Sequence, residues 1–247
     1  MTLAGQPWPT VAFLALVALV AGLARGFSGF GAALIFIPLA SAAVGPSLAA
    51  PILLAIDAIG ALPMLPAAWR LSDRSAVFMM SAGALVTLPL GALALTHLDP
   101  IALRWGISGA ILVLLGVLTS GWRYAGRPLP PVTVGIGLIS GFLSGVAQIG
   151  GAPPVVYWLG SASSPIRVRA NLVLFLACSS LYSVGAYMYS GLFSWAGVTL
   201  SLAAGPAYLA GTTLGMRMFG LASPQTFRRV CYALITLAAV IGLPVFR

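Results

Sequence analysis

Long apolar stretches run along the whole chain, and short polar or basic connections separate them. A helix needs about 20 apolar residues to span the hydrocarbon core of a bilayer. By this rule the pattern predicts hydrophobic helices at about residues 8–24, 29–45, 48–69, 75–96, 102–122, 131–148, 150–163, 170–190, 194–218 and 227–246. The first and second segments, and the sixth and seventh, are short for full spans. Each of these pairs is therefore either two spans or a hairpin that enters the membrane and returns.

Two related glycine-rich sequences interrupt the apolar pattern at the short pairs. The first is Gly22-Leu-Ala-Arg-Gly-Phe-Ser-Gly-Phe-Gly31, and the second is Gly141-Phe-Leu-Ser-Gly-Val-Ala-Gln-Ile-Gly150. Their shared glycines align at one offset of 119 residues, as from Gly22 to Gly141, and two prolines further along keep that offset. Glycine-interrupted hydrophobic segments at corresponding places in two halves of a chain point to the central site of a transporter.

The arginines predict the orientation of the segments. Ten of the twelve basic residues lie on alternate connections. Such residues hold short loops in the cytoplasm, so we expect both termini outside and the second half inverted relative to the first. The predicted fold is an all-α polytopic membrane protein with two inverted repeats of about five hydrophobic segments each, and with glycine-broken or re-entrant helices at the start of each half. The repeats are residues 1–122 and 132–247, joined by a cytoplasmic loop at 123–131.

The composition supports a membrane protein and excludes other classes. Charged residues make up only 6% of the chain, against about 25% in a soluble domain, so lipid must surround it. The net charge is +9, but the arginines are scattered and form no basic face for a nucleic-acid backbone, so we expect no nucleic-acid partner. Cys178 and Cys231 lie in apolar stretches and no His or Cys cluster has metal-ligand spacing, so we expect neither a metal nor a cofactor.

The glycine-rich sequences supply the first candidate substrate-binding residues. These are Gly26, Gly29 and Gly31 in the first copy and Gly145, Gly150 and Gly151 in the second. Glycine lets the backbone leave helical geometry, and irregular backbone at membrane depth must be buried in protein or line a watery cavity. Helix ends at such breaks would direct N–H groups at an anion. The alternative is that these small residues only allow helices to pack closely.

Charged residues inside the apolar segments are the second group of candidates. Asp57 is the carboxylate in the interior of a predicted span, where a charged group must pair with an opposite charge or be hydrated. Its counterpart at the 119-residue offset is Leu176, so the repeated scaffold does not require a carboxylate. We expect Asp57 to carry a proton or pair with a cation; the alternative is a structural acid paired with Arg25. Arg25 either binds an anionic substrate from the tip of a hairpin or anchors the chain in the cytoplasm. Ser28 in the first glycine-rich sequence is a further substrate-binding candidate. The weaker candidates are polar residues in or near the second one: Ser144, Gln148, Asn171, Ser179, Ser180 and Ser183.

The second glycine-rich sequence, continued through Ala152, resembles the signature of the sulfite exporter TauE/SafE family of membrane permeases. The first copy, followed by Phe36-Ile-Pro-Leu39, resembles the N-terminal copy in the same family, and the resemblance covers essentially the whole chain. It implies transport of small sulfur-containing anions, such as sulfite or organosulfonates, across the bacterial cytoplasmic membrane. By position, the substrate loops would be residues 26–33 and 145–154.

Our leading hypothesis is therefore an anion permease that works by alternating access, with Asp57 as the candidate for proton coupling. One alternative is an intramembrane serine protease with Ser28 as nucleophile and His97 as base. The arginine pattern places His97 in an external connection, whereas a base must lie within hydrogen-bond reach of its nucleophile. A second alternative is a membrane assembly partner that transports nothing. The substrate, the direction of transport, the coupling ion and homo-oligomerisation stay open.

Overall fold

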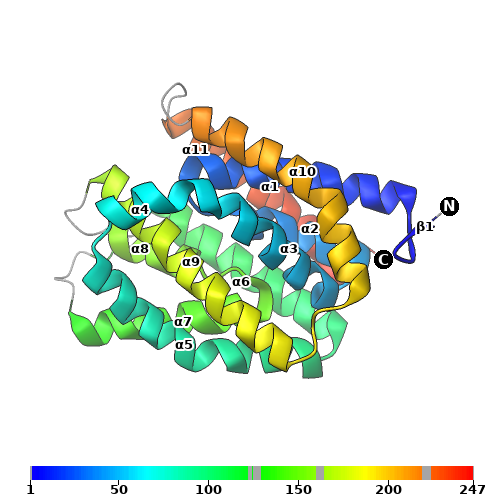
Figure 1. Cartoon of the computed structure of the whole chain (residues 1–247), viewed down its shortest axis with the longest axis horizontal. Helices are drawn as coiled ribbons and strands as arrows, with labels where there is room; N and C mark the ends of the chain where they lie inside the picture. Colours follow the sequence, from blue (N-terminus) through cyan, green and yellow to red (C-terminus); the bar gives the residue numbers. More distant parts are fainter. Residues whose placement is uncertain (1, 122–123, 125–128, 160–163, 219–223, 247) are drawn as a thin grey trace.

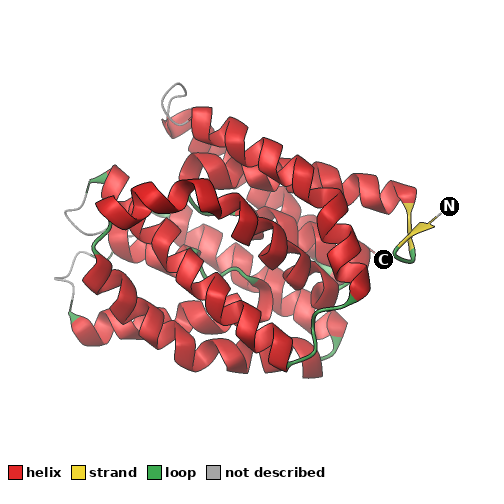
Figure 2. Ribbon diagram, viewed as in Figure 1, coloured by secondary structure: helices red, strands yellow, loops and turns green. Residues whose placement is uncertain are grey.

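The computed structural model describes residues 2–121, 124, 129–159, 164–218 and 224–246, and this part of the chain is almost entirely helical (Figure 2). A short hairpin of β1 (Thr2–Leu3) and β2 (Gln6–Pro7) precedes the first helix. Most of the predicted loop at 123–131 and the last residues of the predicted segment 150–163 lie outside the described residues.

Each predicted hydrophobic segment contains an observed helix. The first half holds α1 (Trp8–Ser28), α2 (Ala32–Val44), α3 (Pro46–Ala61), the 3-10 turn η1 (Leu62–Met64), α4 (Leu65–Leu71), α5 (Arg74–His97) and α6 (Pro100–Thr119). The second half holds α7 (Pro130–Ala147), α8 (Ala152–Leu159), α9 (Pro165–Tyr189), α10 (Trp195–Met218), α11 (Pro224–Gly242) and the 3-10 turn η2 (Pro244–Phe246). In the described part of the chain, six helical stretches are long and apolar enough to cross a membrane. The all-α polytopic membrane fold is confirmed.

Several helix starts follow from their first residues. Helices α3, α6, α7 and α9 begin at a proline, which is pre-organised for the first helical position. The Asp99 side chain accepts hydrogen bonds from two N–H groups at the start of α6, and Asp73 does the same once for α5. Two of the three carboxylates are therefore helix caps, and Asp57 is the one left inside a span.

The most extensive helix contacts come in matching pairs. Helix α1 packs along α10, and α5 packs along α7; next in extent are α5 with α9, α10 with α3 and, equal to the last, α2 with α11. At the 119-residue offset, α1 corresponds to α7, α3 to α9 and α5 to α10. The first four of these interfaces have counterparts with the two halves exchanged, whereas the counterpart of α2 with α11, which is α8 with α6, is much smaller. The halves interlock, because each long interface joins a helix from one half to a helix from the other.

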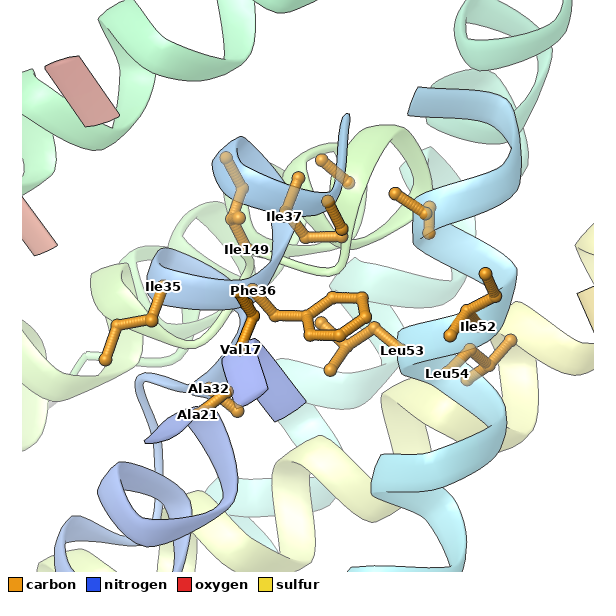
Figure 3. Close-up of a cluster of buried hydrophobic side chains, with 14 of the residues drawn as sticks. Val17, Ala21, Ala32, Ile35, Phe36, Ile37, Ile52, Leu53, Leu54 and Ile149 are labelled. Carbon is orange, nitrogen blue, oxygen red and sulfur yellow. The ribbon is translucent and has the colours of Figure 1, made fainter. Parts of the chain in front are cut away.

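Helix α2 lies in the middle of the apolar core. Figure 3 shows Ile35, Phe36 and Ile37 of this helix between side chains of α1 and α3 and close to Ile149. Phe36 and Ile37 are fully buried. The interruption between α1 and α2 is thus enclosed by protein, which non-helical backbone at membrane depth requires.

The ends of the helices alternate between two ends of the molecule. In Figure 1 both termini lie at one end, and the α4–α5 connection, the ends of α8 and α10, and the starts of α9 and α11 lie at the opposite end. That opposite end, the arginine-bearing end, carries Arg70, Arg74, Arg167, Arg169 and Arg217. Arg25 departs from the expectation of an arginine in a connection, because α1 continues four residues beyond the predicted segment. It is buried in the last turn of that helix.

Candidate functional site

The two interruptions, which we call the first break (between α1 and α2) and the second break (between α7 and α8), have the same backbone conformation. Helix α1 is capped at its C-terminus by Gly29 with φ 80°, and α7 is capped by Gln148 with φ 57°. These positions correspond at the 119-residue offset, and each N–H donates to the carbonyl four residues earlier, Gly29 to Arg25 at 2.8 Å and Gln148 to Ser144 at 2.9 Å. Gly31, with φ 94°, then precedes α2. The left-handed turn is therefore kept in the second copy although its glycine has been replaced.

Side-chain hydrogen bonds hold Gln148 in this unfavourable conformation. Its amide Nε2 donates to the Ser144 carbonyl and the Ser183 hydroxyl at 3.0 Å each, and to the Tyr187 hydroxyl at 3.2 Å. The Tyr187 hydroxyl donates to the Gly145 carbonyl at 2.8 Å. The carbonyls of Ser144 and Gly145 at the end of α7 are thus tied to α9 through one buried polar cluster.

One small cavity, the central cavity, lies between the two interruptions. Its lining comes from both breaks and the helix starts that follow them, and from α3 and α9: Arg25, Phe30, Gly31, Ala32, Ala33, Leu34, Leu53, Asp57, Gln148, Ile149, Gly151, Ala152, Leu176, Ser179 and Ser180. The offset-related Asp57 and Leu176 face it together. About 30 Å³ of it is open to the centre of a water molecule, enough for one or two waters.

Two helix N-termini meet at the central cavity. The first residues of α2 and of α8, Ala32 and Ala152, both line it. The first N–H groups of a helix have no partner within the helix, and the helix dipole adds partial positive charge there. Helix α8 begins with Ala152-Pro-Pro154, and proline has no N–H, so α8 adds the Ala152 N–H and its dipole, whereas the first residues of α2 all carry an N–H. Both helix starts attract anions, and they converge on the cavity from the two halves.

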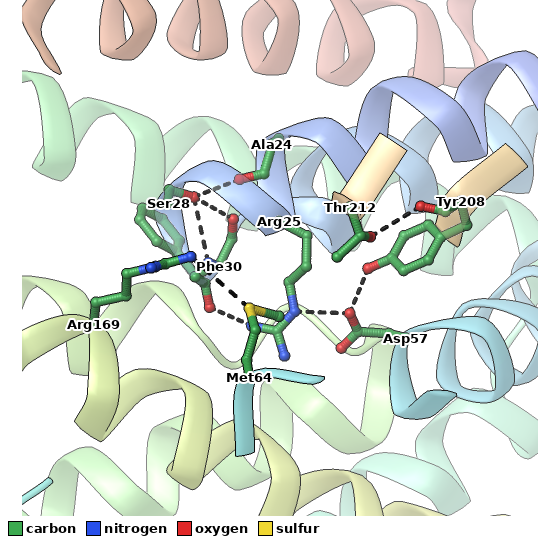
Figure 4. Close-up of polar contacts among 10 residues, drawn as sticks. Ala24, Arg25, Ser28, Phe30, Asp57, Met64, Arg169, Tyr208 and Thr212 are labelled. Atoms are coloured by element: carbon green, nitrogen blue, oxygen red, sulfur yellow. Dashed lines mark hydrogen bonds and ion pairs between the residues drawn. The ribbon is translucent and has the colours of Figure 1, made fainter. Parts of the chain in front are cut away.

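Arg25 adds a full charge to this cavity through a buried polar cluster (Figure 4). Its Nε donates to Asp57 Oδ1 at 2.8 Å, and its Nη1 donates to the Gly29 carbonyl. The Tyr208 hydroxyl donates to the same oxygen of Asp57. Arg25 is 1% exposed, and its Nη2 has no hydrogen-bond partner within the described chain. A buried charged donor without a partner is costly, so this nitrogen is open for an acceptor that enters the cavity.

Arg169 is a further cation at the first break, and it was not among the predicted site residues. Its Nη2 donates to the Gly26 carbonyl at 2.6 Å and lies 4.0 Å from the Met64 sulfur. The sequence does contain a signal for it. The position corresponding to Arg169 in the first half is Ala50, so the repeated scaffold does not need an arginine there, just as it does not need Asp57.

The remaining glycine candidates serve helix packing in the structure. A Cβ at Gly26 would clash with the Thr212 carbonyl oxygen of α10, and one at Gly145 would clash with the Leu88 carbonyl oxygen of α5. A Cβ at Gly150 would clash with the Ser140 carbonyl oxygen in the preceding helix. Gly151 differs, because it lines the central cavity and the nearest atom to a Cβ there would be a Leu176 methyl at 3.5 Å.

The polar candidates lie in three places: Ser28 at the first break, Ser144 at the second break, and Asn171 beside the N-terminal cap of α5. The Ser28 hydroxyl lies within hydrogen-bond distance of the Ala24 carbonyl, at 2.8 Å, and the Phe30 carbonyl, at 2.6 Å. Ser144 is buried and supports Gln148 through its carbonyl. The Asn171 amide oxygen accepts from the Asp73 N–H at 2.8 Å. Asn171, in α9, thus contacts the start of α5 and is not part of the central cavity lining.

Ser28 and His97 do not share a hydrogen bond. His97 Nδ1 is 2.8 Å from the Thr96 hydroxyl and 2.9 Å from the Leu93 carbonyl, at the end of α5. The partners of the Ser28 hydroxyl are backbone groups at the end of α1 and in the first break: the Ala24 and Phe30 carbonyls and the Phe30 N–H. The two residues of the proposed protease pair are each bound to their own helix end.

Comparisons with known proteins give one family. No curated protein and no solved structure matches the chain. A family model described as sulfite exporter TauE/SafE matches residues 14–241. This range includes both breaks, all the lining residues of the central cavity, and the six helical stretches that can cross a membrane almost in full. The chain is therefore a multi-pass membrane protein of a transporter type, and it belongs to the sulfite exporter TauE/SafE family.

Proposed function

We propose that this protein is a permease for a small oxyanion, sulfite or an organosulfonate, in the bacterial cytoplasmic membrane, and that it binds the anion in the central cavity. One observation carries the proposal. The starts of α2 and α8 and the buried Arg25, whose Nη2 has no partner among the described residues, line the same space between the two breaks. An oxyanion has several acceptor oxygens, and it can use these donors together.

The charges around the cavity favour an anion over a cation. Arg25 and Arg169 outnumber Asp57 at the first break, and the two helix ends add further partial positive charge. The family name supports a sulfur oxyanion. The cavity excludes large solutes, because apolar side chains such as Phe30, Ile149 and Leu176 close it on the sides.

The structure supports an alternating-access mechanism, with this conformation as an occluded one. A space for one or two waters does not hold a sulfonate, so the breaks must move apart when the anion enters. The left-handed residues Gly29, Gly31 and Gln148 are the natural hinges, because discontinuous helices in transporters move at their interruptions.

Asp57 is the proposed point of proton coupling. The charged and titratable groups that face it are Arg25 on α1 and Tyr208 on α10, while Arg169 on α9 lies beyond Arg25. An anion bound at Arg25 competes with the Asp57 carboxylate for the guanidinium. Protonation of Asp57 removes that competition, so proton binding and anion binding support each other.

Transport assays in proteoliposomes test the function. Uptake of sulfite, thiosulfate, sulfonates and carboxylates is measured with and without a pH gradient. We expect saturable uptake of sulfite or a sulfonate, and its loss in the double variant Arg25→Gln/Asp57→Asn, which removes both charges and leaves no unpaired ion. Arg167→Gln is the matched control, since Arg167 is exposed near the start of α9, and it should transport normally. Absence of flux for every anion, or normal flux in the double variant, would refute the proposal. No flux at all would favour the non-transporting assembly partner.

We also propose that the protein has no hydrolase activity, because the Ser28 hydroxyl supports the first break through two carbonyls. The test is labelling with a fluorophosphonate. A Ser28-dependent adduct would overturn this part of the proposal.

A further inference from the structure

A second and larger cavity, the vestibule, lies at the arginine-bearing end of the molecule. About 210 Å³ of it is open to the centre of a water molecule, against about 30 Å³ in the central cavity. Its walls are η1 and α4 on one side, the start of α9 on the other, and Met216 near the end of α10. Arg169 is the charged side chain among the described residues that line it.

Arg169 reaches from the vestibule to the first break. A Cβ on Gly29 would lie 2.9 Å from Arg169 Cγ, so the arginine stem covers the residue that ends α1. The guanidinium Nη2 goes on to the Gly26 carbonyl at 2.6 Å. Figure 4 shows this guanidinium beside Met64 and Ser28. Phe30 and Gly31, directly after this point, line the central cavity. Arg169 therefore stands between the two cavities.

The Arg169 guanidinium gives the Gly26 carbonyl the hydrogen bond that a continuing α1 helix would have given it. Continued helix would give the Gly26 carbonyl the Phe30 N–H as its partner, but this N–H lies 3.3 Å from the Ser28 hydroxyl instead. The Gly29 carbonyl is bound by Arg25 Nη1. Two guanidinium groups thus hold the end of α1, and the one that comes from the second half is at the vestibule.

We propose that the vestibule is a second, peripheral binding site for a small oxyanion, and that Arg169 is the gate between it and the central cavity. An anion in the vestibule takes the Arg169 guanidinium away from the Gly26 carbonyl. The first break then loses its link to α9 and can open toward the central cavity. Arginine suits this exchange, because its planar fork binds an oxyanion through two parallel hydrogen bonds where the carbonyl offers only one acceptor.

This inference rests on the proposed function, but it can be wrong while the proposed function is right. The gate exists in one half only, since the first half has Ala50 at the corresponding position. Opening toward the arginine-bearing end therefore depends on an anion, whereas opening toward the other end does not use this contact.

A labelling experiment tests the gate. Ser180→Cys places a thiol in the central cavity of a chain whose two cysteines, Cys178 and Cys231, have been replaced by alanine. A bulky, membrane-impermeant maleimide is then applied to the arginine-bearing side of vesicles. Arg169→Gln should raise the labelling rate about tenfold, the order expected for loss of one charge-assisted hydrogen bond. Arg167→Gln should leave it unchanged. Equal rates in the two variants would show that Arg169 is not the gate.

A binding experiment tests the second site separately. Equilibrium dialysis with radiolabelled sulfite is carried out on the purified full chain. The variant Arg25→Gln/Asp57→Asn, which lacks the central charges, should still bind sulfite, and a further Arg169→Gln substitution should abolish this binding. If the double variant binds no sulfite, the vestibule is not a site, and the transport assay on the unchanged chain still decides the proposed function. Gel filtration of each variant in detergent confirms that it is folded.

Discussion

At the residue scale, Gln148 shows how the second break is stabilised without glycine. A residue with a Cβ loses about 1–2 kcal/mol in the left-handed region, and Gln148 offsets this with its amide bonds to Ser144, Ser183 and Tyr187. Gln148→Ala removes the side-chain hydrogen bonds but keeps the free-energy cost of the left-handed backbone. Gln148→Gly removes both the hydrogen bonds and that cost.

We therefore predict that Gln148→Ala is less stable than Gln148→Gly by about 1 kcal/mol, and that both are less stable than the unchanged chain. Thermal unfolding in detergent, followed by the loss of the monodisperse peak in gel filtration, gives the order. An alanine variant as stable as the glycine variant would mean that the break relaxes to another conformation when the amide is removed.

Neighbouring glycines of the second break have opposite tolerance to a side chain. We predict that Gly150→Ala lowers the yield of folded protein, because its methyl group meets the Ser140 carbonyl. Gly151→Ala should fold normally, since its methyl group has ordinary contacts with Leu176 and Phe30. Gly151→Val should fold as well but reduce anion flux several-fold, because it fills the central cavity. Yield and proteoliposome flux are measured for all three, and full flux in Gly151→Val would separate Gly151 from the substrate path.

The same glycines show where sequence reasoning reaches its limit. Both the break and the alternative of close helix packing were predicted from the glycine-rich sequences, and the structure contains both. Gly29 and Gly31 have positive φ, whereas Gly26 and Gly145 let two backbones touch. The two roles look alike in a sequence because each one requires only that a Cβ be absent, and the partner helix that distinguishes them is more than 50 residues away along the chain.

At the element scale, the α1–α10 interface depends on glycines from both helices. Gly22 and Gly26 contact the backbone of α10, and Gly211 and Gly215 contact the backbone of α1. We predict that Gly211→Val strongly destabilises the protein, because the side chain meets the Leu19 carbonyl and forces the helices apart. Overpacking of this kind costs about 1–3 kcal/mol or more.

Gly185→Ala in α9 is the matched control for this prediction. No atom lies within 4 Å of a Cβ at that position, so alanine should stabilise the helix by about 0.5–1 kcal/mol. Both variants are compared with the unchanged chain by thermal unfolding in detergent. A valine at position 211 without effect would show that the two helices are not in contact in the membrane.

Helix positions were predicted to within a few residues because length and apolarity decide them. The third segment is the exception. The sequence predicts one helix at 48–69, and the structure has α3, η1 and α4 there. Pro63 and Pro66 supply no N–H donor, and a 3-10 turn accommodates the change of hydrogen bonding between the two helices. Apolarity alone carries no information about such a turn, which happens to form one wall of the vestibule.

At the scale of the whole molecule, the proposed inverted repeat predicts the side of each connection. Ser164, before α9, and Ser194, before α10, are exposed and lie at opposite ends of α9. In a chain without its own cysteines, Ser164→Cys should react with an impermeant maleimide only from the cytoplasm, and Ser194→Cys only from outside. Labelling of both from the same side would contradict the orientation of the second half. If Ser194→Cys reacted only from the cytoplasm and Ser164→Cys only from outside, the whole topology would be the reverse of the one proposed.

In the proposed repeat, corresponding helices share their main interfaces, but the charges differ between the two halves. Arg25, Asp57 and Arg169 correspond to Ser144, Leu176 and Ala50 in the opposite halves. Two related halves give a fold that can open to either side with similar geometry. Charges that have no counterpart in the other half then make the two openings unequal in free energy, and a ligand that binds those charges can shift the balance.

Asp57 provides the sharpest test of this asymmetry. Asp57→Asn keeps the size of the side chain and an oxygen that can accept from Tyr208 and Arg25, but it cannot take up a proton. We predict that this variant still transports the anion and that its flux no longer responds to a pH gradient. Asp99→Asn is the control, because Asp99 caps α6 outside the core, and its flux should keep the response of the unchanged chain. A gradient response that persists in Asp57→Asn would move proton coupling to another group, and the Arg25–Asp57 pair would then be a fixed part of the scaffold that orients the guanidinium toward the substrate.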